Sequence, residues 1–256
     1  MSPITLEQIH EYAQYITSTL ELSGHIAGVR LLKPGAEPPN DGIQLKQHRY
    51  CQALMKARHG QSVTLDGAGI NCPAAAAAFG FRPLPEGLRN GSGLVGFGIV
   101  SDAKTGERMF AEMPVMQPGE IHSLHIFPLD QAEAQPDVIV IEDAVENLMW
   151  VNLAYLNAMG GKRLNSSTAI LQATCVDSTI IPYQEKRLNF GYGCYGCREA
   201  TDLGTSESVV GFPIELLPAI AENLAYLAQK AIPNSRSKRA LAALQRQDDD
   251  GKVLHP

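Results

Sequence analysis

The stretch Asp137-Val138-Ile139-Val140-Ile141, which directly follows Pro136, decides the fold class. Its continuous apolar run predicts a strand that is buried on both faces. A helical pattern follows from Ala144 to Met159 and ends at Gly160-Gly161, because glycine commonly terminates a helix. A buried strand that leads directly into a long helix is typical of an α/β fold. We therefore expect an α/β protein.

Strands and helices also alternate through the rest of the chain. Thr5 and Gln8 can form a capping box at the start of an N-terminal helix over residues 5–20. The other expected elements are a strand at 28–32, a helix at 45–59, strands at 62–65 and 95–100, and an amphipathic helix at 214–230.

The two halves of the chain present similar landmarks in the same order. Each has a strand, a helix that ends at glycine, a cysteine near an expected helix start, a Gly-x-Gly and a Phe-Pro pair. This order predicts an internal duplication, with two similar lobes around a shared cleft. The predicted parts are an N-terminal helix at 1–24, a first α/β lobe at 25–135, a second α/β lobe at 136–232 and a polar, flexible tail at 233–256.

Composition excludes several classes of protein. The chain has 256 residues and a formal net charge of −6, without the basic stripe that nucleic-acid binding requires. The N-terminus has no signal-peptide pattern, and no apolar stretch approaches the ~20 residues that span a bilayer. We therefore expect a cytoplasmic protein that binds neither nucleic acid nor membrane. Five cysteines in a reducing compartment are more typical of ligands or reactive thiols than of disulfides.

The run Gly91-Ser92-Gly93-Leu94-Val95-Gly96 spells G-x-G-x-x-G, the pattern of dinucleotide-binding loops. Such a loop needs a strand before it and a helix after it. Here a Pro- and Gly-rich segment precedes the run and a strand is expected after it, so we reject a dinucleotide site.

The strongest chemical signal is the pair Cys194 and Cys197, which lies among three glycines. This spacing lets two thiolates ligate one zinc or iron centre, and glycine lets backbone N–H groups turn toward the sulfurs. A dithiol that cycles to a disulfide is an alternative, as is a plain pair of small apolar residues in a turn. Arg198 follows at once, and it either lowers the pKa of a thiolate, binds an anionic ligand or is a surface arginine.

The other three cysteines differ in their surroundings. Cys72 precedes a proline, which favours the first position of a helix, so Cys72 is expected at the N-cap, where the helix dipole favours a thiolate. Cys175 is expected near a helix start that Thr174 or Asp177 caps. Cys51 falls inside the expected helix at 45–59, and we expect it to be a buried core cysteine outside the site.

Four segments of the chain resemble a known family, catalogued as domain of unknown function 169, which is common in anaerobic bacteria and archaea. They are Arg49-Tyr50-Cys51-Gln52-Ala53-Leu54, Cys72-Pro73-Ala74-Ala75-Ala76-Ala77-Ala78, Gln172-Ala173-Thr174-Cys175-Val176-Asp177 and Gly193-Cys194-Tyr195-Gly196-Cys197-Arg198-Glu199-Ala200-Thr201-Asp202. The similarity runs from about residue 25 to about residue 240. The resemblance implies no catalytic residue, because the role of the family is unsettled.

The leading functional hypothesis is an iron–sulfur protein. Four thiolates match the usual requirement of a four-iron cluster, and the expected ligands are Cys72, Cys175, Cys194 and Cys197. An oxygen-sensitive centre also suits a family of anaerobes. The expected role is electron transfer to a partner protein or redox chemistry on a small molecule, and a homo-oligomer stays open.

Two alternatives remain. The same cysteines fit a structural zinc site, although a chain of this size does not need zinc to fold. The second alternative is a metal-free protein that binds an anionic small molecule or cofactor, with Arg198 and Asp177 as ligand-binding residues.

Overall fold

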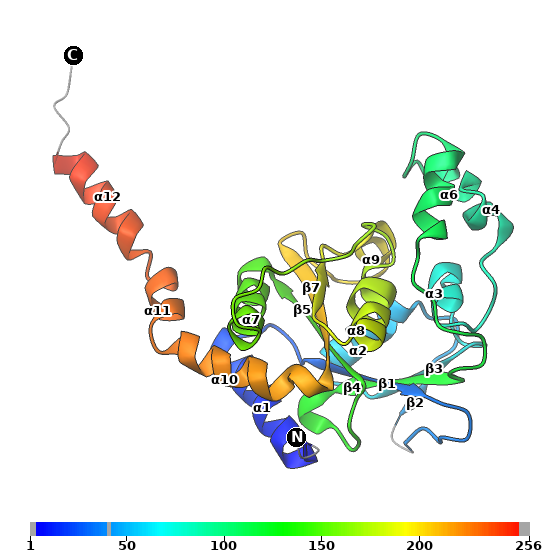
Figure 1. Cartoon of the computed structure of the whole chain (residues 1–256), viewed down its shortest axis with the longest axis horizontal. Helices are drawn as coiled ribbons and strands as arrows, with labels where there is room; N and C mark the ends of the chain where they lie inside the picture. Colours follow the sequence, from blue (N-terminus) through cyan, green and yellow to red (C-terminus); the bar gives the residue numbers. More distant parts are fainter. Residues whose placement is uncertain (1–3, 40–41, 251–256) are drawn as a thin grey trace.

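A seven-stranded sheet with helices on both faces forms the centre of the molecule (Figure 1), so the expected α/β class is confirmed. The computed structural model describes residues 4–39 and 42–250. The strand order is β2-β3-β4-β1-β5-β7-β6. The strands are β1 (Ala27–Leu32), β2 (Ile43–Gln44), β3 (Val63–Asp66), β4 (Ser123–Pro128), β5 (Val138–Ala144), β6 (Asn189–Gly191) and β7 (Glu207–Pro213).

Most of the sheet is antiparallel. Only the short strand β2 pairs in parallel with its neighbour β3 among the strands that the structure describes. The two halves of the chain meet at the pair β1–β5, in which Gly28 lies opposite Ile139. The stretch that predicted the fold class thus lies in the middle of the sheet. Because both of its faces are covered, nearly all of β5 is buried, and its first four residues are apolar.

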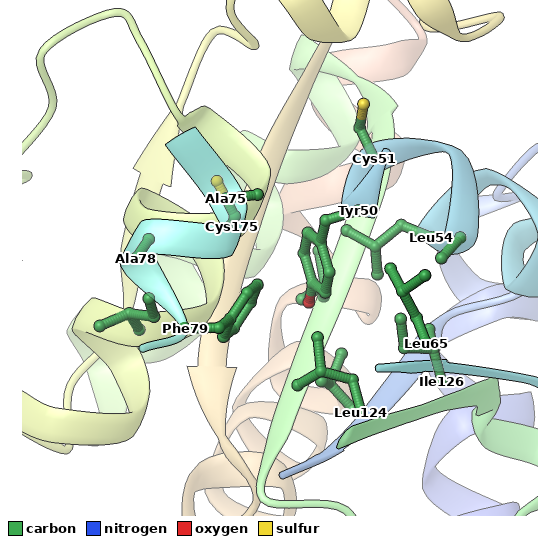
Figure 2. Close-up of a cluster of buried hydrophobic side chains, with 14 of the residues drawn as sticks. Tyr50, Cys51, Leu54, Leu65, Ala75, Ala78, Phe79, Leu124, Ile126 and Cys175 are labelled. Carbon is green, nitrogen blue, oxygen red and sulfur yellow. The ribbon is translucent and has the colours of Figure 1, made fainter. Parts of the chain in front are cut away.

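Helices α2 (Tyr50–Arg58), α3 (Pro73–Ala78), α8 (Ile181–Glu185) and α9 (Tyr195–Ala200) and a π-helix (Ala173–Ile180) cover one face of the sheet. The rings of Tyr50 and Phe79 pack at a centroid distance of 4.9 Å in this core (Figure 2). The Tyr50 hydroxyl lies 2.8 Å from that of Thr179, which ties α2 to the π-helix.

The opposite face is covered by α1 (Leu6–Leu20), α7 (Val145–Ala158) and α10 (Leu217–Ala228) (Figure 1). The predicted capping box of Thr5 and Gln8 begins α1, and Ile9, Ile16 and Leu20 are buried against the sheet side. Alternate residues of β5 supply the two cores, since Val138 and Val140 face one and Ile139 and Ile141 face the other.

Three short helices lie together beside the sheet: α4 (Glu86–Arg89), α5 (Ser92–Gly96) and α6 (Ala103–Ala111). The prediction of a strand at 95–100 is wrong, because the chain is helical up to Gly96. The reason is a close approach of two glycines, since a Cβ on Gly106 would lie 2.8 Å from the carbonyl oxygen of Gly91. That contact packs α5 on α6 and cannot be read from local sequence.

The helix expected at 45–59 begins later, at Tyr50. Residues 43–44 form β2 instead, and Gln47 adopts a φ of 56°, which a right-handed helix does not allow. The late start places Cys51 in the first turn of α2 rather than in its interior.

The order of the strands mirrors the two halves of the chain. Outward from the central pair, β4, β3 and β2 follow β1 on one side, and β7 and β6 follow β5 on the other. The helices that follow β1 and β5 cover opposite faces, however, since α2 packs in one core and α7 in the other. The internal duplication therefore stays a prediction.

The end of the C-terminal segment leaves the body of the molecule. Helix α11 (Ala231–Arg236) still contacts the body, since Ile232 is buried and Arg236 donates to the carbonyl oxygen of Leu20. Helix α12 (Arg239–Asp250) extends away from it (Figure 1), so the described part of the predicted tail is largely helical. Residues 251–256 lie outside the described residues. In the part of the chain that the structure describes, no helix combines the length and the apolar character needed to cross a membrane.

Candidate functional site: a cavity lined by five cysteines

Cys194 and Cys197 lie at the start of α9, directly after β6. Cys194 is the N-cap residue in an extended conformation, and its sulfur accepts a hydrogen bond from the backbone N–H of Cys197 at 3.3 Å. The two sulfurs are 3.0 Å apart. Gly193 precedes the pair with a φ of 81°, a left-handed conformation that glycine adopts without strain. The expected ligand turn is therefore also a helix start.

Cys72 occupies the N-cap of α3, as the following proline predicted, and is partly exposed. Cys175 lies within the π-helix, and its thiol donates to the carbonyl oxygen of Gln172 at 3.6 Å. The expected cap by Thr174 or Asp177 is wrong, because the helix already begins at Ala173, after Gln172 in a left-handed conformation.

Cys51 lies in the same place as these four residues. All five cysteines line one cavity of about 420 Å³, which we call the cysteine cavity. Cys51 is buried, as expected for a core cysteine, but it lines the same cavity as the other four; its exclusion from the ligands stays a prediction. In Figure 2 its sulfur points away from Leu54 and Leu65. Sequence reasoning missed it because the expected helix began five residues too early.

Both halves of the chain build the cysteine cavity. Its lining comes from residues 49–110 on one side and from residues 171–199 on the other. The walls are mainly apolar, and Phe97 and Tyr195 are the most exposed of the lining apolar residues. The structure thus brings together all four cysteines that the sequence singled out. Their role as metal ligands stays a prediction.

The surroundings favour the neutral form of three of these thiols, those of Cys175, Cys194 and Cys197. Burial raises the pKa of Cys175 well above its ordinary value, and the charges of neighbouring cysteines add to this effect. The hydrogen bond with Cys197, together with burial, also raises the pKa of Cys194. For Cys197 the bond with Cys194 lowers the pKa, but the contact with Cys51 and burial outweigh it and raise the pKa to about 12.

Among the described residues, no group of three or more His, Cys, Asp or Glu side chains is arranged to hold one metal ion. The cysteines of an iron–sulfur cluster bind different irons, so they do not need to converge on a single point.

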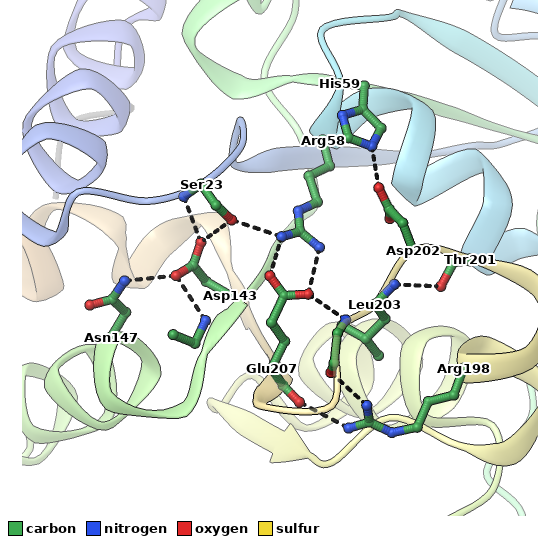
Figure 3. A network of polar contacts seen from close by, with 12 residues as sticks. Ser23, Arg58, His59, Asp143, Asn147, Arg198, Thr201, Asp202, Leu203 and Glu207 are labelled. Atoms are coloured by element: carbon green, nitrogen blue, oxygen red, sulfur yellow. Dashed lines mark hydrogen bonds and ion pairs between the residues drawn. The ribbon is translucent and has the colours of Figure 1, made fainter.

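Arg198 does not line the cysteine cavity. Its guanidinium donates to the carbonyl oxygens of Gly204 at 2.7 Å and Glu207 at 2.9 Å (Figure 3), and also to that of Tyr192. The first two bonds hold the segment that connects α9 to β7, and the third holds the segment between β6 and α9. The geometry therefore assigns Arg198 a structural contact, in place of the contact with the sulfurs that its sequence position suggested.

A second network holds the same segment from the other side. Arg58, at the end of α2, pairs with Glu207 through both of its terminal nitrogens and donates to the Ser23 hydroxyl at 2.8 Å (Figure 3). Ser23 in turn donates to Asp143 at the end of β5. The start of β7 is thus tied to α2 and to the central strand.

The cation that reaches the cysteine cavity is Arg49, which sequence reasoning did not single out. It donates through Nη1 to the carbonyl oxygen of Gly196 at 3.0 Å and to Glu199 at 2.6 Å. The hydrogen bond that Arg49 donates to Glu199 raises the pKa of Arg49. Its position directly before Tyr50-Cys51 was the available signal, since a residue that starts α2 lies beside the first-turn cysteine.

Asp177 lies on the π-helix but lines a different cavity. It is 2% exposed, and its carboxylate accepts a hydrogen bond from Thr168 at 2.5 Å. Burial raises the pKa of Asp177 to about 7, against the opposing effect of that bond.

Comparison with known proteins identifies the family and nothing beyond it. Residues 15–223 match the family model DUF169, described as an uncharacterised ArCR family. No curated protein and no solved structure matches the chain. The matched range contains all five cysteines and every strand of the sheet, and it confirms the resemblance seen in the sequence. The chain therefore belongs to the DUF169 family of proteins of unknown function.

Proposed function

We propose that the cysteine cavity holds an iron–sulfur cluster, with Cys72, Cys175, Cys194 and Cys197 as its ligands. The observation that carries this proposal is the convergence of these residues from three separate segments on one cavity of about 420 Å³. Convergence of four thiols is not needed for stability in a core of this size, whereas four thiolates are the usual ligand set of a cluster.

The donor set fits the chemistry of such a group. Thiolates are soft ligands, which favour iron–sulfur clusters, zinc and Cu(I) over hard cations. Arg49 lines the cavity together with Glu199, with which it pairs, so this pair adds no net charge; the remaining N–H groups of Arg49 can donate to a thiolate-ligated centre. The 3.0 Å separation of Cys194 and Cys197 is shorter than the ~3.8 Å between two sulfurs on one tetrahedral ion with bonds of ~2.3 Å. Binding therefore requires these two side chains to rotate apart.

The surroundings favour electron transfer or reduction of a small molecule. The apolar wall limits contact of the sulfurs with water, which protects a reduced centre and tunes its potential. The exposed rings of Phe97 and Tyr195 form part of the lining, where a redox partner protein or a small molecule can approach. When bound, the cluster would supply one electron at a time; the chain positions it and limits its access to solvent.

Ligand variants test this proposal. We expect Cys194→Ser and Cys175→Ser, purified without oxygen, to lose the broad visible absorption of the wild-type protein together with its iron. Cys51→Ser is the matched control, because it removes a thiol from the same cavity that is not among the four ligands, and it should keep the iron. Equal iron content in wild type and in Cys194→Ser would contradict the assigned ligands. Zinc in the wild type that Cys194→Ser loses would instead establish the zinc alternative.

One distance favours a second candidate function, a reversible disulfide. At 3.0 Å, the sulfurs of Cys194 and Cys197 need only a small movement to reach the ~2.05 Å of a disulfide bond. In that reaction the two thiols give two electrons and two protons to a small-molecule disulfide, which leaves as two thiols. Alkylation and mass measurement after exposure to oxidised glutathione would detect it. Protection of two thiols in a metal-free wild type, but not in Cys197→Ser, would favour this candidate over the cluster.

A further inference from the structure

A second cavity lies beside the cysteine cavity and has a different chemical character. It has a volume of about 640 Å³, and we call it the Asp177 cavity. The two cavities share a wall. Gln172 lines both, and α6 presents Phe110 to the cysteine cavity and Arg108 to the Asp177 cavity. A molecule bound in the Asp177 cavity would therefore lie next to the cysteines.

The shared wall is held in an unusual conformation. Ile170 and Gln172 have φ values of 58° and 54°, and such left-handed geometry is disfavoured for residues other than glycine, most of all for a β-branched one. The segment leads into the π-helix, an element that is rare and often lies at functional sites. Strain of this kind persists only where the surroundings enforce it, and it is common at ligand sites.

The floor of the Asp177 cavity is a buried acceptor. Asp177 is only 2% exposed, and one of its carboxyl oxygens accepts a hydrogen bond from the Thr168 hydroxyl at 2.5 Å. The other oxygen has no hydrogen-bond partner among the described residues. Because Asp177 lines the cavity, this oxygen is open to a ligand that donates a hydrogen bond there.

The mouth of the cavity carries two cations. Lys104 and Arg108 are four residues apart on α6, so they lie on one face of the helix, and both are exposed. Neither forms an ion pair with another described residue. Two acids also line the cavity: Asp102 is engaged as the N-cap of α6 by Thr105, while Glu112 is exposed. The two cations are therefore available to an anionic group.

We propose that the Asp177 cavity binds a small hydroxy acid, whose carboxylate contacts Lys104 and Arg108 and whose hydroxyl donates to Asp177. The arrangement separates the two functions, with the cations at the exposed rim and the acceptor at the buried end. This site is independent of the cluster, and it places an anionic ligand away from Arg198, where the sequence had suggested one.

Calorimetric titration of the full chain with malate and succinate tests the proposal, because these two acids differ only in the hydroxyl. We expect malate to bind about 10-fold more tightly than succinate, since only malate can donate a hydrogen bond to this carboxyl oxygen of Asp177. Arg108→Gln, at an exposed position that does not affect folding, should weaken binding of both acids. Asp177→Ala should reduce malate to the affinity of succinate. Lys230→Gln removes an exposed cation outside the cavity; it is the control, and it should leave the affinities for malate and succinate unchanged.

Three results would overturn the proposal: no binding of malate at millimolar concentration, equal affinity for malate and succinate in the wild type, or unchanged affinity in Arg108→Gln. Because Arg108→Gln leaves the buried end of the cavity intact, the test stands even if Asp177→Ala does not fold. The titration is repeated on Cys194→Ser, which should bind malate like the wild type. A failed cluster assignment is thereby distinguished from a failed hydroxy-acid site.

Discussion

At the scale of single residues, Arg49 takes the place beside the cysteines that the sequence suggests for Arg198. Arg198 is adjacent to Cys197 in sequence, yet it bonds to the carbonyl oxygens of Tyr192, Gly204 and Glu207, which lie before and after α9. Arg49 is remote in sequence, yet its Nη1 lies 3.0 Å from the carbonyl oxygen of Gly196, between the two cysteines. Adjacency in sequence says little about side-chain direction at a helix start, because successive residues of a helix point about 100° apart.

Replacing Arg198 should therefore lower stability. Arg198→Ala leaves three carbonyl groups without their donor, and we expect a loss of about 2 kcal/mol in the free energy of unfolding. Urea denaturation measures the loss. Arg198→Lys, which keeps the charge but not the fork of donors, should recover only part of it. A free energy equal to that of wild type in Arg198→Ala would show that these bonds are not formed in solution.

Glu142 on β5 should make stability depend on pH. It is 8% exposed, its Oε1 has no hydrogen-bond partner among the described residues, and burial raises its pKa to about 7. Arg58 opposes this shift, and Asp202 and Glu207 add to it. Because the folded state holds this proton between its ordinary pKa of about 4.5 and about 7, stability must fall as pH rises through that window.

We expect Glu142→Gln to remove the contribution of Glu142 to this fall, while that of Asp177, whose pKa burial also raises to about 7, remains. The wild-type free energy of unfolding should decrease by up to about 3 kcal/mol between pH 5 and pH 8 through this group, since one pKa unit corresponds to about 1.4 kcal/mol. Denaturation curves at both pH values, for both proteins, give the difference. Parallel pH profiles for the two proteins would mean that Glu142 is ionised or hydrated in the folded state.

At the scale of elements, the sequence predicted the start of a helix where neighbouring residues determine it. The capping box of Thr5 begins α1, and the proline after Cys72 begins α3, without any contact from elsewhere in the chain. The π-helix was not predicted, because its shape depends on a contact with β7. A Cβ on Gly211 would lie 1.8 Å from the carbonyl oxygen of Ser178, so only glycine lets the two elements approach this closely.

Gly211→Ala should therefore displace the π-helix that carries Cys175 and Asp177. We expect a loss of more than about 3 kcal/mol in the free energy of unfolding, as for severe overpacking. Gly96→Ala is the matched control, because a Cβ there meets nothing within 4 Å, and it should match wild type. Thermal and urea denaturation compare the three proteins. Similar stability of Gly211→Ala and Gly96→Ala would show that the close contact is absent.

At the scale of the whole molecule, the sequence predicted the α/β class and the four cysteines that lie together, but not how the halves are joined. The apolar run at 137–141 predicts a buried strand, and the proline after Cys72 predicts a helix start, from neighbouring residues alone. The opposite placement of α2 and α7, and the inclusion of Cys51 in the cysteine cavity, depend on long-range packing. The two halves contribute to one sheet through β1 and β5, and to one cavity above one of its faces.

The central claim is that this cavity, built from both halves, holds a cluster. Its most direct test is the iron and acid-labile sulfide content of the full wild-type chain, purified without oxygen. The claim predicts a brown protein with about four irons and four sulfides per chain, as expected for a four-iron cluster on four cysteines. A colourless protein without iron and sulfide, whether it contains zinc or no metal, would contradict it.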